Sequence, residues 1–284
     1  YNGTGVNYLF ADWWEFDPAT NTWTQKADLA GVKRQAAIGF SIGSKGYIGL
    51  GLNYETTTLL RDLWEYNPTN NSWTQKADYG GTARFASTCF VIGNSAYVGL
   101  GSDNYPTYSF RDDFWKFDPS SNSWSAVADF PGTARYAASG FSIGLKGFLG
   151  IGWNQASFFN DFWQYDSGSN VWIQKTDFPG TNRSAGVGFS VGNFGYMGAG
   201  LNDNAVFRDF YKYDSTSNAW TQIADLPSIA GTVSAFVILD KAYVGTGTTT
   251  FPPLNPLNHF WVYSTTGNSW SAIADMGGTI RASA

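Results

Sequence analysis

Five arginines and five aspartates stand at matching positions of a repeated pattern. The arginines are Arg34, Arg84, Arg135, Arg183 and Arg281, and the aspartates of the same repeats are Asp62, Asp113, Asp161, Asp209 and Asp12. A planar guanidinium binds a carboxylate through two parallel hydrogen bonds, so these arginines suit either a clamp for an anionic ligand or ion pairs with the aspartates. One repeat has Ala230 in place of the arginine and His259 in place of the aspartate. The joint loss favours pairing, and we predict structural ion pairs.

The sequence contains few residues that could bind a metal ion or a cofactor. His259 is the only histidine and Cys89 the only cysteine, and no zinc or calcium spacing occurs. Gly-x-Gly pairs end predicted strands without a following helix, so they do not form a phosphate loop. Cys89 stands where other repeats have Gly39 or Gly140, which indicates a small buried residue. We predict no metal and no cofactor, and we keep His259 as a candidate polar contact.

A second group of candidates is aromatic and lies in loops that differ from repeat to repeat. Divergent loops on a repetitive scaffold are where specificity is usually built. Aromatic rings beside amides and carboxylates suit the apolar faces and hydroxyl edges of sugars, and they suit peptides as well. The candidate ligand contacts are Tyr8, Tyr54, Tyr105, Tyr108, Trp153 and Phe158, joined by Gln35, Phe85, Tyr136 and His259. The alternative is that some of these rings only pack between repeats.

The elements that position these residues recur about every 50 residues. Six copies of one phrase, such as DLWEYNPTNNSW from Asp62, close on Trp23, Trp73, Trp124, Trp172, Trp220 and Trp270. Each phrase predicts two strands joined by a polar turn, and a second hairpin rich in small residues accompanies it. Four strands with this period are typical of a propeller blade. We predict an all-β, six-bladed β-propeller with four-stranded antiparallel blades.

The repeat resembles that of the kelch family, in which an inner strand led by arginine, a glycine-rich end to the second strand, an aromatic third strand and a tryptophan opening the fourth recur. The resemblance covers residues 1–284 as a single domain, with blade boundaries near 30, 80, 131, 179, 228 and 278. The chain departs from the common pattern in one respect. It has Gly-x-Gly, as at Gly49 and Gly51, where adjacent glycines are usual.

The two ends of the chain carry complementary parts of one further repeat. Arg281 opens an inner strand at the end of the chain, and the first five residues, YNGTG, resemble the second-strand sequence YIGLG from Tyr47. We therefore predict that strands from both termini close the last blade, which removes exposed sheet edges. The missing middle of this blade leaves open that the chain belongs to a longer one.

Charge and hydropathy limit the partners. The net charge of −5 and the pI near 4.8 offer no basic face for phosphates, so we predict no nucleic-acid partner. The apolar runs have the length of strands and fall short of the roughly 20 residues of a membrane helix, so we predict no membrane insertion.

Three functions fit this architecture. We expect a non-catalytic recognition or scaffold module, secreted or at the cell surface, that binds glycan or protein through the variable loops around the central channel. The resemblance to kelch propellers also implies an enzymatic alternative, because a sialic acid mutarotase family uses a six-bladed kelch propeller with acid and base side chains near the channel. The third alternative is a structural repeat element of a larger surface assembly.

Overall fold

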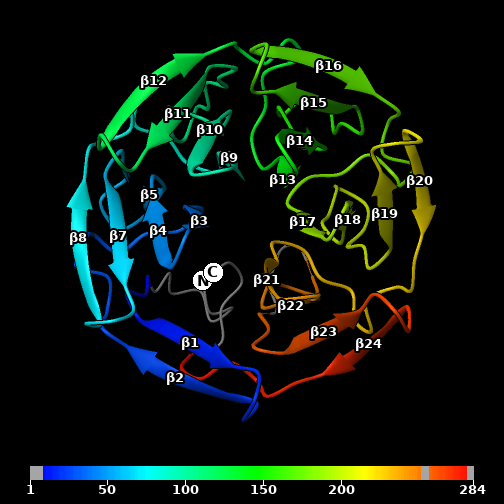
Figure 1. Ribbon diagram of the computed structural model, residues 1–284. Helices are drawn as coiled ribbons and strands as arrows, with labels where there is room; N and C mark the ends of the chain where they lie inside the picture. Colours follow the sequence, from blue (N-terminus) through cyan, green and yellow to red (C-terminus); the bar gives the residue numbers. More distant parts are fainter. Residues whose placement is uncertain (1–8, 251–255, 280–284) are drawn as a thin grey trace.

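The computed structural model describes residues 9–250 and 256–279, which form a ring of β-sheets around a central axis (Figure 1). Five sheets have four antiparallel strands each, in simple meander order with the first strand nearest the axis. We call these sheets blades I to V in chain order. Within these residues, no helix has the length and apolar character that crossing a membrane requires.

The strands are short and of nearly equal length in all five blades. Blade I comprises β3 (Ile38–Ile42), β4 (Lys45–Gly49), β7 (Leu63–Asn67) and β8 (Ser72–Lys76). Blade II comprises β9 (Thr88–Ile92), β10 (Ser95–Gly99), β11 (Phe114–Asp118) and β12 (Ser123–Val127). Blade III comprises β13 (Ser139–Ile143), β14 (Lys146–Gly150), β15 (Phe162–Asp166) and β16 (Val171–Lys175). Blade IV comprises β17 (Val187–Val191), β18 (Phe194–Gly198), β19 (Phe210–Asp214) and β20 (Ala219–Gln222). Blade V comprises β21 (Ser234–Ile238), β22 (Lys241–Gly245), β23 (Phe260–Ser264) and β24 (Ser269–Ala272).

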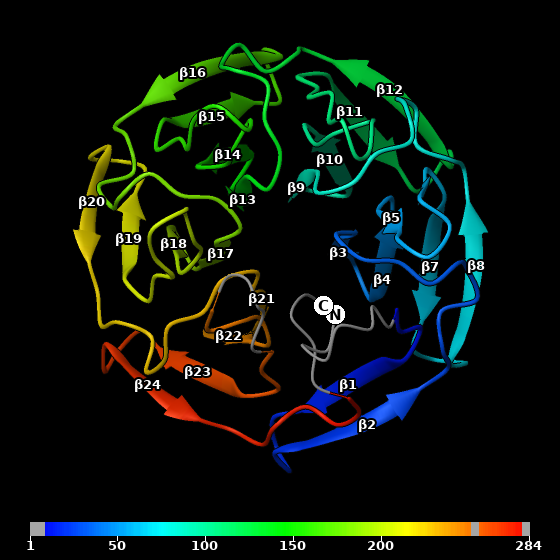
Figure 2. The same ribbon diagram turned by 180° about the vertical axis from the view of Figure 1, so that it is seen from behind.

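The prediction of six four-stranded blades needs a correction, because the described residues form five. The sixth position of the ring, between blades V and I, holds a two-stranded sheet of β1 (Trp13–Asp17) and β2 (Thr22–Lys26) (Figures 1 and 2). The strands expected to complete it, led by Arg281 and by Tyr1, lie outside the described residues. Closure of the last blade by both termini therefore stays a prediction.

The core lies between neighbouring blades because each sheet presents aromatic side chains to the next one. Phe141 and Phe148 stand opposite each other on β13 and β14, and their rings stack 5.4 Å apart. Phe148 also lies 5.5 Å from the ring of Tyr213 in blade IV. Burial of such rings is the main apolar contribution to the fold.

The polar turns of the repeated phrase join each outer hairpin to its neighbour. In blade I the side-chain oxygen of Asn71 accepts a hydrogen bond from the backbone N–H of Ala27 at 2.8 Å, and the indole of Trp73 donates to the carbonyl of Ala27 at 2.9 Å. The same pair of bonds joins Asn21 and Trp23 to Ala274 at 3.0 and 2.9 Å. This joint explains why an asparagine stands two residues before each closing tryptophan.

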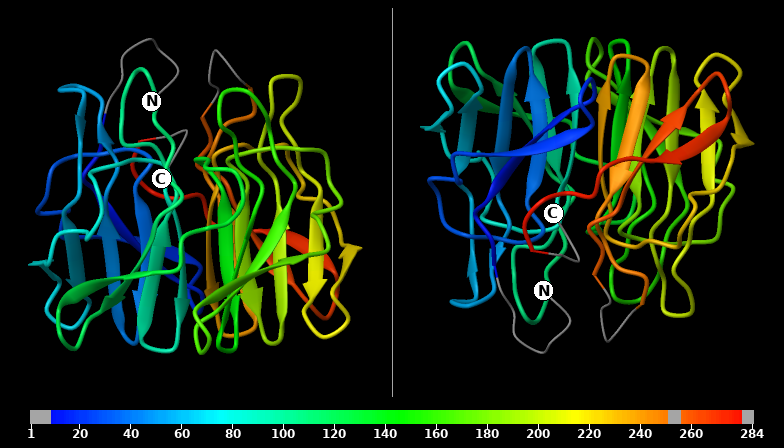
Figure 3. Two further views of the ribbon diagram at one scale, coloured as in Figure 1. Left: turned by 90° about the horizontal axis from the view of Figure 1, so that it is seen from above. Right: turned by 90° about the horizontal axis from the view of Figure 1, so that it is seen from below.

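The connections between strands divide between two faces of the ring, and Figure 3 shows the strands running between these faces. Because each blade is an antiparallel meander, the turns inside its two hairpins lie on one face, which we call the turn face. The connections between the hairpins and between blades lie on the other, the loop face. The loop after β4 adds the small hairpin β5 (Leu52–Asn53) and β6 (Thr58–Leu59) there.

Candidate functional site

The structure brings four of the predicted arginine–aspartate pairs together. Each pair forms two parallel hydrogen bonds; the pairs are Arg34–Asp62, Arg84–Asp113, Arg135–Asp161 and Arg183–Asp209. Glycines leave room for these side chains. A Cβ on Gly31, Gly81 or Gly180, three residues before the arginine, would lie 2.7–2.8 Å from an Nη2 atom, and a Cβ on Gly152, just after β14, would lie 2.8 Å from Cδ of Arg135. Arg281, the predicted partner of Asp12, lies outside the described residues.

The surroundings of Arg183 show what these arginines do. Its two Nη atoms lie 2.5 and 2.9 Å from the carboxylate oxygens of Asp209, and its Nε donates to the carbonyl of Thr181 at 2.8 Å. The ring centroids of Phe207 and Phe178 lie 3.9 and 5.1 Å from the guanidinium carbon. The side chain is 0% exposed. Because it is enclosed in this way, this guanidinium is not open to an anionic ligand.

The carboxylates of two pairs are held in their charged form. For Asp62, burial raises the pKa, but the hydrogen bonds and charge of Arg34 outweigh burial, and the pKa lies below its usual value. Asp113 beside Arg84 shows the same balance, and its pKa is also lowered.

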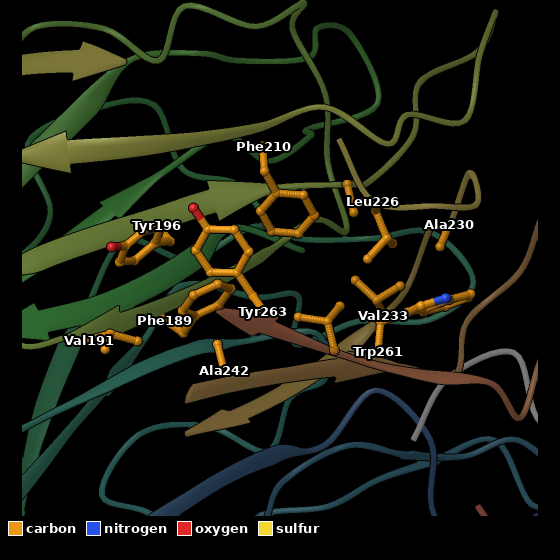
Figure 4. Close-up of a cluster of buried hydrophobic side chains, with 12 residues drawn as sticks. Phe189, Val191, Tyr196, Phe210, Leu226, Ala230, Val233, Ala242, Trp261 and Tyr263 are labelled. Carbon is orange, nitrogen blue, oxygen red and sulfur yellow. The ribbon is translucent and has the colours of Figure 1, made fainter. Parts of the chain in front are cut away.

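Blade V replaces the ion pair with apolar side chains. Leu226, Ala230, Val233 and Trp261 are buried together in one hydrophobic cluster (Figure 4). His259 is half-exposed at the position of the missing aspartate, and its Nδ1 lies 2.8 Å from a carboxylate oxygen of Asp275. The structure thus brings His259 to Asp275 at the edge of the blade.

The predicted aromatic contacts of blades I to III, together with Phe110, form one continuous set of touching rings. We call this set the aromatic array; its members are Tyr54, Phe85, Tyr105, Tyr108, Phe110, Tyr136, Trp153 and Phe158. Successive ring centroids lie 5.5 to 6.0 Å apart along Tyr54, Tyr105, Phe85, Tyr136, Trp153 and Phe158. Tyr108 contacts Tyr105, Phe85 and Tyr136 at 5.6 to 6.0 Å. Predicted residue Tyr8 lies outside the described residues.

Backbone hydrogen bonds around the axis fix the inner end of the array. Phe85 and Tyr136 precede Ala86 and Ala137, which adopt left-handed backbone conformations at φ 51° and 53°. The N–H of Ala86 donates to the carbonyl of Ala36, and that of Ala137 donates to Ala86, at 2.8 and 2.9 Å. These bonds join the inner ends of blades I, II and III, so the two rings start from a rigid frame.

The array occupies only one side of the ring. At the position of Phe85 and Tyr136, blade I has Gln35, which pairs with Leu52 through backbone hydrogen bonds of 3.0 Å. Blades IV and V have Ser184 and Gly231 there. A feature needed by every blade would recur in all five, so the aromatic side chains of blades II and III are specific to this sector.

The hydroxyls of Tyr105, Tyr108 and Tyr136 remain neutral hydrogen-bonding groups at physiological pH. A hydrogen bond to the Tyr54 hydroxyl, followed by burial, raises the pKa of Tyr105 to about 12. Burial also raises the pKa of Tyr108 and of Tyr136. The array therefore combines apolar ring surface with hydroxyls that both donate and accept hydrogen bonds.

An ion pair between Asp103 and Arg111 lies in the loop that carries Tyr105 and Tyr108. A carboxylate oxygen of Asp103 lies 2.6 Å from both Nε and Nη2 of Arg111 and accepts a hydrogen bond from the Thr82 hydroxyl at 3.0 Å. Burial raises the pKa of Asp103, but these partners outweigh burial and lower it overall, while the Asp103 hydrogen bond raises the pKa of Arg111. Asp103 is thus an ionised group with its partners in place and is poorly suited to act as a general acid.

Sequence reasoning missed one member of the array and found no metal ligands. Phe110 stacks 5.5 Å from Tyr136 and bridges to Ser102 in the same loop, so its place in a divergent loop was the available signal. Across the described ranges, no group of three or more His, Cys, Asp or Glu side chains could hold a metal ion. Burial raises the pKa of the Cys89 thiol to about 12, which keeps it protonated.

Comparison with known proteins supports the fold. No family model and no curated protein sequence matches this chain. A solved structure described as "Structure of YjhT" is similar over 92% of this chain and 91% of its own, with a TM-score of 0.79 and 16% sequence identity. At that identity the similarity concerns the fold alone. The protein is a β-propeller built from four-stranded antiparallel blades.

Proposed function

We propose that the protein is a non-catalytic binding module that takes up a carbohydrate on the aromatic array of its loop face. The observation that carries this proposal is the confinement of eight touching aromatic rings to blades I to III of a repetitive scaffold. Aromatic faces pack against the C–H faces of sugar rings, and neutral hydroxyls hydrogen-bond to sugar hydroxyls. A secreted or cell-surface location suits such a module.

The propeller that supports this site is proposed to be six-bladed and of the kelch type. In this arrangement β1 and β2 are the outer half of a sixth blade, and residues from both termini supply its inner strands. The joint of Asn21 and Trp23 with Ala274 supports this, because it repeats the geometry that links Asn71 and Trp73 to Ala27.

Binding to a glycan array, followed by titration calorimetry with the best glycan, tests the proposal. Tyr54 is 36% exposed, so Tyr54→Ala should change stability little. Loss of one stacking ring should weaken binding by about 1–2 kcal/mol, which is roughly 5- to 30-fold. Asn204→Ala, an exposed position in the blade IV loop on the same face, is the matched control and should bind as the parent does.

The outcomes separate the competing functions. Weakened binding by Tyr54→Ala and Trp153→Ala, with Asn204→Ala unchanged, supports the proposal. Absence of glycan binding together with capture of a defined protein that depends on the same residues would replace the carbohydrate by a protein ligand. Accelerated exchange of sugar anomers, followed by NMR, would contradict the non-catalytic assignment.

A further inference from the structure

A cavity opens on the turn face, between blades IV and V, on the side of the ring opposite to the loop face. Its volume is about 780 Å³, which is within the range of sites for small organic ligands. The turns β17–β18, β21–β22 and β23–β24 border it, together with residues of β18, β19 and β20. It shares no residue with the aromatic array.

Lys212 provides the cavity with a cation. It lies on β19 opposite Tyr196 of β18 and Thr221 of β20, both of which also border the cavity. Its ammonium nitrogen lies 4.6 Å from the ring centroid of Phe194. Among the described residues Lys212 is in no ion pair, whereas Lys146 lies 2.8 Å from Asp166. The charge of Lys212 is therefore available to a ligand.

Two apolar side chains at the cavity break the pattern of the other blades. Phe194, which is 37% exposed, opens the second strand of blade IV, where the other blades have Lys45, Ser95, Lys146 and Lys241. Leu239 is 92% exposed and stands in the inner turn of blade V, where the other blades have Gly43, Gly93, Gly144 and Gly192.

The backbone conformation at Leu239 is unfavourable for a leucine. Its φ of +57° is almost that of the four glycines, at +58°, and this left-handed conformation disfavours a leucine. At 92% exposure the side chain gains little packing inside the protein to offset that cost. Both departures from the repeat thus place apolar surface around one cavity, which is the pattern of a binding site rather than of the scaffold.

We propose that this cavity binds a small organic carboxylate whose apolar body lies between Phe194 and Leu239 and whose carboxylate pairs with Lys212. The hydroxyls and amides of Thr221, Thr265 and Gln222, which also border the cavity, offer hydrogen bonds to the remaining polar atoms of such a ligand. Asp240 also borders the cavity, in the exposed turn that carries Leu239. Its negative charge repels the ligand's carboxylate, but exposure to water screens this repulsion.

A matched pair of probes tests both parts of the ligand. 3-Phenylpropanoate and its uncharged amide, 3-phenylpropanamide, are titrated into the full ¹⁵N-labelled chain and followed by two-dimensional NMR. We expect saturable shifts in resonances of the cavity residues and about tenfold tighter binding of the carboxylate. Lys212→Met should weaken the carboxylate to the level of the amide and leave the amide unchanged, and Leu239→Gly should weaken both.

Lys116→Met is the matched control, because Lys116 of blade II occupies the same register position, opposite Tyr97 and Ser125. It should bind both probes as the parent does. Equal affinity for carboxylate and amide, or equal losses in Lys212→Met and Lys116→Met, would overturn the proposed ion pair. Inorganic phosphate binding as tightly as the carboxylate would overturn the role of the apolar body, and absence of saturable shifts would overturn the site. None of these outcomes depends on the array.

Discussion

Replacement of Arg183 by alanine removes one complete ion pair from a blade and tests the structural role of all four. The guanidinium is 0% exposed, makes two bonds to Asp209 and donates to two backbone carbonyls, those of Thr181 and Ala199. The variant would therefore leave a carboxylate and two carbonyls without their donors. It would also open a space beside the ring of Phe207.

The magnitude follows from burial. Removal of one partner of a buried ion pair costs about 3–5 kcal/mol, because the remaining charge is left uncompensated. Asp209 is 22% exposed, so water can partly solvate it, which places the loss near the lower end, at about 3 kcal/mol. For a chain of this size, each kcal/mol lowers the melting temperature by roughly 2–4 °C, so the variant should melt about 10 °C lower.

Urea unfolding followed by tryptophan fluorescence measures this change. The neighbouring Arg208 provides the control, because its Nε lies 3.5 Å from Asp225 in an exposed pair, with its side chain 54% exposed. Arg208→Ala should cost less than about 1 kcal/mol. If Arg183→Ala unfolds at the same urea concentration as Arg208→Ala, the arginines are not structural and the argument for ion pairs is refuted.

Three further outcomes follow. The pKa values of Asp62 and Asp113 are lowered in the folded protein, so these carboxylates stabilise it above a pH of about 4, the pKa of an unfolded aspartate. This stability is lost as the pH falls further, so the urea midpoint of unfolding should decline below that pH. A midpoint that stays constant down to about pH 2.5 would contradict this. Asn71→Ala should cost about 0.5–1.5 kcal/mol in urea unfolding because the N–H of Ala27 loses its acceptor, whereas Asn71→Asp keeps that acceptor and should cost less. Leu239→Gly should raise stability by about 0.5–1 kcal/mol by relieving the left-handed conformation, and a lower melting temperature would show that the leucine packs in the turn.

The fold was largely predictable because the same pattern of strand and turn residues occurs six times in the sequence. Its aromatic strands and polar turns gave the four-stranded meander in every described blade. The joint between blades was not predicted. Asn71 and Ala27 come from neighbouring hairpins 44 residues apart, so local turn chemistry could not show that the asparagine bonds to the neighbouring blade.

The site was predictable in its residue types and only partly in its arrangement. Differences among copies picked out Tyr105, Trp153, Phe85 and Tyr136, but not that Phe85 and Tyr136, which lie just before β9 and β13, join the other two rings into one set. His259 was selected because it is the only histidine and stands at an aspartate position, and the sequence could not show that its Nδ1 lies 2.8 Å from a carboxylate oxygen of Asp275.

Blade V shows that the buried ion pair is replaceable only as a unit. Its arginine position is Ala230 and its aspartate position is the half-exposed His259, and Ala230 is buried in one apolar cluster with Leu226, Val233 and Trp261. An apolar cluster avoids the cost of removing two charges from water, so it can match a well-formed ion pair in stability. A blade with only one of the two charges has neither advantage, because it must bury that charge without a partner. The joint absence of arginine and aspartate in one blade, and their joint presence in four, is what this energetic argument requires.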